Sequence, residues 1–331
     1  ISPRFKMASD KVVVEEVSIT GTKPSFGARF KSHYKRFWWA HLIALVVSVL
    51  VVSLPMVYVG YPRIAQADIN DSTLSVSAMF ISDPSPESFH LNQTQIIGTD
   101  SIFHPKIFSF EAEVGLEGAS ASFANVTVPQ VQAKDGTVVN VAQRVELSDA
   151  AAFAAFSSAV MMSEEFGLTV SGRPRLKQGP LPTITVTYDK AVTMKGLNKL
   201  KGFTIISMHP VSNRADGNNA VGQVSIPNPS VMTLSMGNLT MDLWSANGTS
   251  LGQSFLNDLV LVPGNNTVPM LSNIDMMKVI SLLPRNPPYV IPVKVTGNSS
   301  TYNGKEIPYF TAALAANKLT VDLNLTEVLG S

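Results

Sequence analysis

The chain has 331 residues, with 25 Lys and Arg, 24 Asp and Glu, a formal net charge of +1 and no cysteine. The lack of cysteine excludes disulfides, zinc–cysteine sites and thiol nucleophiles, so an exported domain of this size must be stabilised by an apolar core. The near-neutral charge hides an asymmetry. Residues 1–37 hold eight basic and three acidic residues, a net +5, and the remainder is therefore −4.

The first 36 residues predict a basic, mostly disordered cytosolic tail. Ser, Thr, Lys and Gly prevail there, and only residues 12–14 form an apolar cluster. The cations predict attraction to anionic lipid headgroups, and membrane topology explains them better than nucleic-acid binding does. We expect translation to begin at Met7.

An uncharged apolar run over 37–61 predicts one transmembrane helix, because about 20 residues suffice to cross a bilayer. The basic residues before the run predict a cytosolic N-terminus and export of everything after it. A cleaved signal peptide is the alternative, but the run is too long and no small-x-small cleavage site follows it. The membrane-interface residues predicted from charge and aromatic character are Lys35, Arg36, Trp38, Trp39, Tyr58 and Tyr61.

Asn-x-Ser/Thr sequences occur only after the apolar run, which favours a glycosylated lumenal or extracellular face. Several lie in turn sequences from which a glycan could project into water, and some sites can remain unused. The predicted acceptors for N-linked glycans are Asn70, Asn92, Asn125, Asn238, Asn247, Asn265, Asn298 and Asn324.

The exported part is predicted to be mainly β. Residues 232–236 and 239–243 alternate apolar and polar side chains, as in antiparallel strands with one face on a core. Asn247-Gly248, Asp135-Gly136 and Asn303-Gly304 are typical of tight hairpin turns. We therefore expect two tandem antiparallel β-sandwich domains after the helix.

Two short helices are predicted within this β-rich part. Residues 148–163 begin with an N-cap serine, and residues 272–283 begin with a capping box of Ser272 and Asp275 and stop before Pro284. Their apolar side chains would either line a lipid-binding cavity or fill a core, and the sequence leaves both open. The residues concerned are Phe153, Phe156, Val160, Met276, Met277, Val279, Ile280 and Leu283.

An internal repeat organises the exported part. The similar segments, in the same order in both halves, are 81–85 and 226–230, Asp149 and Asp275, 168–172 and 293–297, and 184–189 and 319–324. We therefore predict a first repeat over 63–191, a connector over 192–202 and a second repeat over 203–331.

The second repeat resembles the β-sandwich of the second late-embryogenesis-abundant group, in the form found in fungal single-span membrane proteins of unknown function. Val224 to Ser230, the alternating residues to Leu243, and Asn247 to Gly252 carry this resemblance. The first repeat matches less well, because Asp83 replaces the Asn of the Asn-Pro corner. The resemblance implies no catalytic residue. It implies domains in the lumen of a vacuolar or related membrane that bind or transfer lipid.

The residues offer no clear chemistry. The exported histidines lack the spacing of a helical zinc site, and neither a Gly-x-Ser-x-Gly sequence nor a phosphate-binding loop is present. We expect no enzyme activity, cofactor, metal or nucleic-acid partner. The leading hypothesis is lipid binding or transfer, with the bilayer, bound lipid and glycans as partners. The alternative is a structural or signalling anchor that binds a protein, a cell-wall polymer or a second copy of the chain.

Overall fold

A computed structural model describes residues 26–212, 214–286 and 288–325 of the chain. Two compact units are present, Ile1–Met56 and Val57–Ser331. The predicted disorder of the tail lies outside the described residues for 1–25. Residues 26–36 are helical instead, because they contain helix formers such as Ala28 and Arg29 and no proline, and the apolar helix extends them.

The apolar run is helical throughout. Helix α1 covers Phe26–Pro55, with a kink at Phe37 where the apolar run begins. A π-helical turn η1 (Met56–Gly60) follows Pro55, whose missing N–H interrupts the ladder of helical hydrogen bonds, and α2 covers Tyr61–Asp71. Among the described residues, Phe37–Asp71 is a helix that is long and apolar enough to cross a membrane, with a mean hydropathy of 2.7 over an 18-residue window. It is therefore a candidate single span.

The first repeat consists of seven main strands and one helix. One layer has the order β1-β2-β7 and the other β11-β8-β4-β5, and an isolated bridge between Ala124 and Leu147 joins β5 to the end of β7. Strands β1 and β11 contact each other at the other edge. The elements are β1 (Thr73–Ser85), β2 (Ser88–Gly98), β4 (Phe110–Leu116), β5 (Ser122–Val128), β7 (Thr137–Glu146), α3 (Ala150–Met162), β8 (Glu165–Gly172) and β11 (Tyr188–Lys195).

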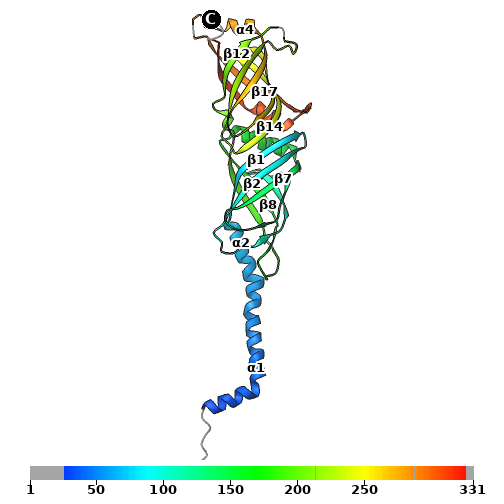
Figure 1. Cartoon of the computed structure of the whole chain (residues 1–331), viewed down its shortest axis with the longest axis vertical. Helices are drawn as coiled ribbons and strands as arrows, with labels where there is room; N and C mark the ends of the chain where they lie inside the picture. Colours follow the sequence, from blue (N-terminus) through cyan, green and yellow to red (C-terminus); the bar gives the residue numbers. More distant parts are fainter. Residues whose placement is uncertain (1–25, 213, 287, 326–331) are drawn as a thin grey trace, which may run out of the picture. The chain divides into compact units, whose positions relative to one another are not determined.

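The second repeat has the corresponding order β12-β13-β16-β15-β14-β17-β19, and its first and last strands also contact each other. A short 3₁₀ turn η2 (Asn198–Leu200) precedes it. Figure 1 labels β12, β14 and β17 of this repeat. The elements are β12 (Thr204–Pro210), β13 (Ala220–Asn228), β14 (Met232–Ser245), β15 (Ser250–Leu261), β16 (Gly264–Ile274), α4 (Met276–Ser281), β17 (Val290–Tyr302), β18 (Lys305–Glu306), α5 (Pro308–Ala316) and β19 (Lys318–Asn324).

The matching strand orders reveal the duplication and agree with two of the predicted correspondences: Asp149 and Asp275 each cap the helix before an equivalent strand, and 168–172 and 293–297 lie in the equivalent strands β8 and β17. The other two predicted correspondences are out of register. The first strands β1 and β12 correspond, whereas the sequence comparison paired residues 81–85 of β1 with 226–230 at the end of β13. The last strands β11 and β19 correspond, whereas residues 184–189 lie mostly before β11. The short Pro-containing segments are similar because each forms a local corner of the chain. That similarity does not show that the strands around them are equivalent. The predicted connector 192–202 also includes the end of β11.

The helix caps were only partly predicted. Asp149, and not Ser148, caps α3, because its carboxylate accepts hydrogen bonds from the backbone N–H groups of Ala151 and Ala152. Asp275 caps α4 by accepting from the N–H of Lys278, whereas Ser272 lies in β16. The helix α5, which begins at Pro308, was missed.

The two predicted alternating segments around residue 237 are halves of the single strand β14. The pairing of β14 with β15 shifts register on both sides of Gly237, which has a φ of +70°. The bulge moves the inward side chains from even to odd positions, so the alternation restarts. Asn303 and Gly304 both have positive φ and connect β17 to β18, as predicted for a two-residue hairpin turn.

The two repeats share one core. Strand β1 pairs in parallel with β14, with Met79 opposite Met232, and so joins the sheets of both repeats. Helices α3 and α5 pack against each other, and the Phe153 ring lies 4.8 Å from the Tyr309 ring, centroid to centroid. Most of the buried apolar residues, from both repeats, form one continuous cluster. Val57–Ser331 is therefore one compact unit built from two repeats.

Candidate functional site

We call Val57–Ser331 the β-rich unit. Within it, helix α2 packs against a small four-stranded sheet. Its order is β10-β9-β3-β6, and Ile107, Leu176 and Val186 pack with Ala65 and Ile69 of α2 in a second apolar cluster. No linker separates the apolar run from this packing. The strands are β3 (Lys106–Ile107), β6 (Val131–Gln132), β9 (Arg175–Lys177) and β10 (Ile184–Thr185).

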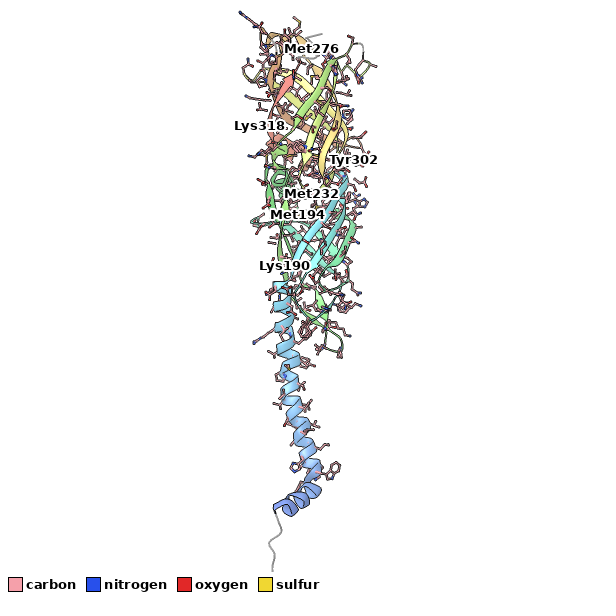
Figure 2. All side chains as sticks on the ribbon, turned by 60° about the vertical axis from the view of Figure 1, so that its left-hand side comes forward. Lys190, Met194, Met232, Met276, Tyr302 and Lys318 are labelled. Atoms are coloured by element: carbon pink, nitrogen blue, oxygen red, sulfur yellow. The ribbon has the colours of Figure 1, made fainter. Side chains whose placement is uncertain are left out.

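Lys190 holds the end of α2 against the β-rich unit. Its Nζ donates hydrogen bonds to the carbonyl oxygens of Asn70 at 2.7 Å and Ser72 at 2.5 Å (Figure 2). A cation is favourable there, because the carbonyls at the end of a helix carry partial negative charge. Partial burial lowers the pKa of Lys190, and the nearby charge of Asp71 opposes that shift.

The predicted membrane-interface residues fall into two groups. Trp38, Trp39 and Tyr58 have exposed side chains on the apolar helix, as interfacial aromatic residues require. Tyr61 differs, because its half-buried ring packs on the second apolar cluster. The structure does not describe the side chains of Lys35 and Arg36. The assignment of these residues to the bilayer surface stays a prediction.

The eight predicted glycan acceptors all have exposed side chains. Several make hydrogen bonds that would have to adapt to a glycan: Asn238 accepts from the N–H of Asp258 at 2.8 Å, and Asn298 donates to the Asp242 carboxylate at 2.8 Å. The acceptors are distributed from α2 to β19. Exposure permits glycosylation at each of them, and their use stays a prediction.

The structure does not bring the predicted cavity-lining residues together. Phe153, Phe156 and Val160 are buried in the core, where Phe156 stacks against Phe123 and the Phe153 ring contacts Phe123 at a tilt. In α4 only Val279 is buried, and Met276 of α4 and Leu283, which follows the helix, are partly buried against the core. Met277 and Ile280 are 78% and 55% exposed, so they do not line an enclosed cavity.

An internal cavity does exist, with other residues in its wall, mostly from the second repeat but also Met161 of α3. Its volume is about 30 Å³, and residues from β14 and β15, such as Met241 and Leu256, line it together with Leu314 of α5. This volume holds about two or three water molecules, whereas ligand pockets usually measure about 300 Å³ or more. The cavity is therefore too small for an acyl chain, and lipid binding stays a prediction.

A larger hollow lies on the surface beside α4. It measures about 370 Å³ and is lined by Ser250 to Gln253 of β15, by Asn273 and Ile274 of β16, and by Asp275 and Lys278. The Lys278 Nζ lies 3.2 Å from the Asp275 carboxylate and donates to the Ser250 carbonyl at 3.3 Å. The backbone N–H of Lys278, and then its ammonium group, hold the pKa of Asp275 below its usual value.

Exposed apolar side chains adjoin this hollow. Met277 and Ile280 project into solvent from α4, and the partly buried Met276 and Leu283 flank them. We call these four residues the distal apolar surface, because α4 lies at the end of the β-rich unit opposite α2 and Lys190 (Figures 1 and 2). The apolar pattern of these residues predicts side chains that face inward, whereas Met277 and Ile280 are exposed.

A polar contact between the repeats occurs at the β1 corner. The Asp83 carboxylate accepts a hydrogen bond from the Tyr302 hydroxyl at 2.9 Å and lies 3.3 Å from Nδ1 of His90. Asp83 has a φ of +46°, which is uncommon for a residue with a side chain. The hydrogen bond from Tyr302, followed by that from His90, lowers the pKa of Asp83. In the sequence, Asp83 is distinguished only as a departure from an Asn-Pro corner.

Comparison with known proteins identifies one family of unknown function. Residues 121–243, from the residue before β5 to a point within β14, match a family described as "Protein of unknown function (DUF3712)". The match covers a little over a third of the chain and spans parts of both repeats. No curated protein matches the chain.

Solved structures give only weak likenesses. A DUF4785 family protein from Legionella pneumophila is 8% identical, with a TM-score of 0.22, over 77% of this chain and 57% of that chain. A bacterial adhesin from Mobiluncus mulieris is 9% identical, with a TM-score of 0.21, over 76% and 96% of the two chains. The periplasmic chaperone SfaE is 11% identical, with a TM-score of 0.15, over 76% and 98%. These low TM-scores do not define a shared fold.

Proposed function

We propose that this chain is a membrane-anchored, non-enzymatic recognition protein that binds a protein partner through the distal apolar surface. The observation that carries the proposal is the exposure of Met277 and Ile280 beside the polar hollow at the end opposite α2. Apolar side chains surrounded by polar groups are typical of protein interfaces. The small internal cavity favours this function over lipid transfer.

The orientation and location belong to the same proposal. Basic residues before the apolar run support a cytosolic N-terminus and a lumenal or extracellular β-rich unit. The resemblance to fungal single-span proteins supports a vacuolar or related membrane. With this topology, the single span would tether the recognition surface to one membrane.

The test compares the full chain with two double variants in its native membrane. Met277→Lys with Ile280→Lys places charges on the distal apolar surface. Val138→Lys with Val260→Lys is the matched control, because both valines are exposed on other strands. We expect one protein to be recovered by cross-linking with the wild type and the control, and to be lost with the α4 variant. Recovery with all three chains would contradict the proposal, and a bound polysaccharide or lipid in place of a protein would favour an alternative function.

A further inference from the structure

The outer face of the small sheet is cationic. Lys106 of β3 lies directly opposite Lys177 of β9, and Ile107 lies opposite Leu176. Side chains alternate between the faces of a strand, so Ile107 and Leu176 point to the apolar cluster with α2, whereas Lys106, Lys177 and Arg175 share the outer face. All three cationic residues are exposed. We call them the basic face.

The basic face has no carboxylate partner among the described residues. The ion pairs among the described residues involve other basic side chains, namely His90, Arg144, Arg214 and Lys278. Instead, Lys106 and Arg175 both lie over the Phe108 ring, at 5.5 and 5.4 Å from its centroid. Like charges directly across two strands are destabilising, and an external anion would relieve that repulsion.

Apolar side chains border the basic face. Ile102 and Phe103, which precede β3, are 84% and 45% exposed. Their segment is held to α2 by a hydrogen bond of 2.7 Å from the Ser101 hydroxyl to the Asp68 carboxylate. Cations next to exposed apolar side chains are the combination that binds lipid surfaces, where the apolar groups enter the headgroup layer.

The covalent structure places this sheet close to the bilayer. The apolar run ends at residue 61, and Tyr61 itself packs on the cluster that also contains Ile69 of the same helix. At about 1.5 Å per helical residue, this packing lies within roughly 12 Å of the end of the apolar run. That distance is comparable to the Debye length of about 8 Å at physiological salt, so the cations can act on headgroup phosphates.

From these observations we propose that Lys106, Arg175 and Lys177 form a phosphate-binding face for phospholipid headgroups of the membrane that the chain's own helix crosses. Ile102 and Phe103 enter the same headgroup layer. This contact would hold the β-rich unit in a fixed orientation relative to the bilayer. It does not depend on the partner bound at the distal apolar surface.

The test uses the full chain in nanodiscs. Because the chain has no cysteine, Thr183→Cys in the exposed loop between β9 and β10 gives a single site for a fluorophore, and Met277→Cys labels the opposite end. Headgroup-quencher lipids should quench the label at 183 but not the label at 277. The label at 183 is then compared in chains carrying K106E, R175E and K177E, or the exposed control substitutions K201E, K305E and K318E.

Quenching at 183 should fall in the basic-face variant, with each removed charge weakening contact with a partly anionic bilayer about fivefold. It should also fall with added salt and be retained in the control variant. A second basic-face variant carries glutamine at the same three positions, which removes the positive charges without adding negative ones. It should lose less quenching than the glutamate variant, and it controls for misfolding caused by the added negative charges. Equal quenching of the wild-type chain and the K106E, R175E and K177E chain at all salt concentrations would overturn the proposal. The covalent link to the helix would then be what keeps the sheet near the bilayer.

Discussion

The Tyr302 hydroxyl donates a hydrogen bond of 2.9 Å to the Asp83 carboxylate, which joins the two repeats across a sequence separation of 219 residues. This contact lies at the corner that follows the parallel pairing of β1 with β14. Together with the packing of α3 on α5, it explains why the two repeats form one compact unit.

Removal of this hydrogen bond should have a pH-dependent cost. The pKa of Asp83 in the folded protein is lowered from its ordinary 3.8, first by Tyr302 and then by His90. The stabilisation is therefore present above pH 3.8 and disappears as the pH falls through the lower folded value. Tyr302→Phe should cost about 1 kcal/mol or less at pH 7, since the pair is exposed.

The measurement is the Tm of both chains between pH 7 and pH 2.5. We expect the difference between wild type and Tyr302→Phe to narrow as the pH falls below 3.8. A difference that stays constant over that range would show that the charge of Asp83 does not contribute.

Truncation of Phe153 should destabilise both repeats together. Its ring lies 5.1 Å from Phe89 in the first repeat and 4.8 Å from Tyr309 in the second. Phe153→Ala should lower the free energy of unfolding by about 3–5 kcal/mol, whereas Met277→Ala on the surface should change it little. Denaturant unfolding followed by near-UV and far-UV circular dichroism should show one shared transition. Two separate transitions, with only the first displaced, would contradict a common core.

The bulge in β14 depends on Gly237. It has a φ of +70°, and a Cβ built there would lie 2.2 Å from the Thr301 carbonyl oxygen. Gly237→Ala should cost about 2–4 kcal/mol, from the positive φ and the close contact together. Gly248 is the matched control, because it also has positive φ but a Cβ there would meet no atom within 4 Å. Equal losses in the two variants, measured by urea unfolding, would show that the contact is relieved without cost.

Glycosylation tests the predicted topology. The eight acceptor asparagines are exposed and follow the apolar run, and residues 1–36 contain no asparagine. Treatment with an N-glycosidase should lower the apparent mass of the native chain, and an Asn-x-Thr site introduced into the tail should stay unmodified. Glycosylation of the introduced site would place the tail on the lumenal side and reverse the topology.

The sequence predicts the elements with strong local signals. The apolar run, the alternation in β14, the Asn303-Gly304 turn and the capping of α4 by Asp275 each depend on neighbouring residues. The helix α5 was missed although Pro308 and the four alanines of the segment favour a helix start and body there. The short strands of the small sheet have two or three residues, too few for a periodic pattern.

Other features could not be predicted because they depend on tertiary contacts. The parallel pairing of Met79 with Met232 and the edge-to-face contact of Phe153 with Tyr309 bring together residues far apart in the sequence. The exposure of Met277 and Ile280 follows from the burial of Val279 alone in a helix of six residues. An apolar pattern in so short a helix does not indicate which side chain enters the core.

Site-specific photo-cross-linking at position 277 tests the proposed recognition surface most directly. A photoreactive residue would replace Met277 in the full chain in its native membrane, and in a parallel chain it would replace Val138, which is 54% exposed on β7. Our account predicts one discrete protein adduct from position 277 and none from position 138. The same adducts from both positions, or none from position 277, would contradict recognition through α4.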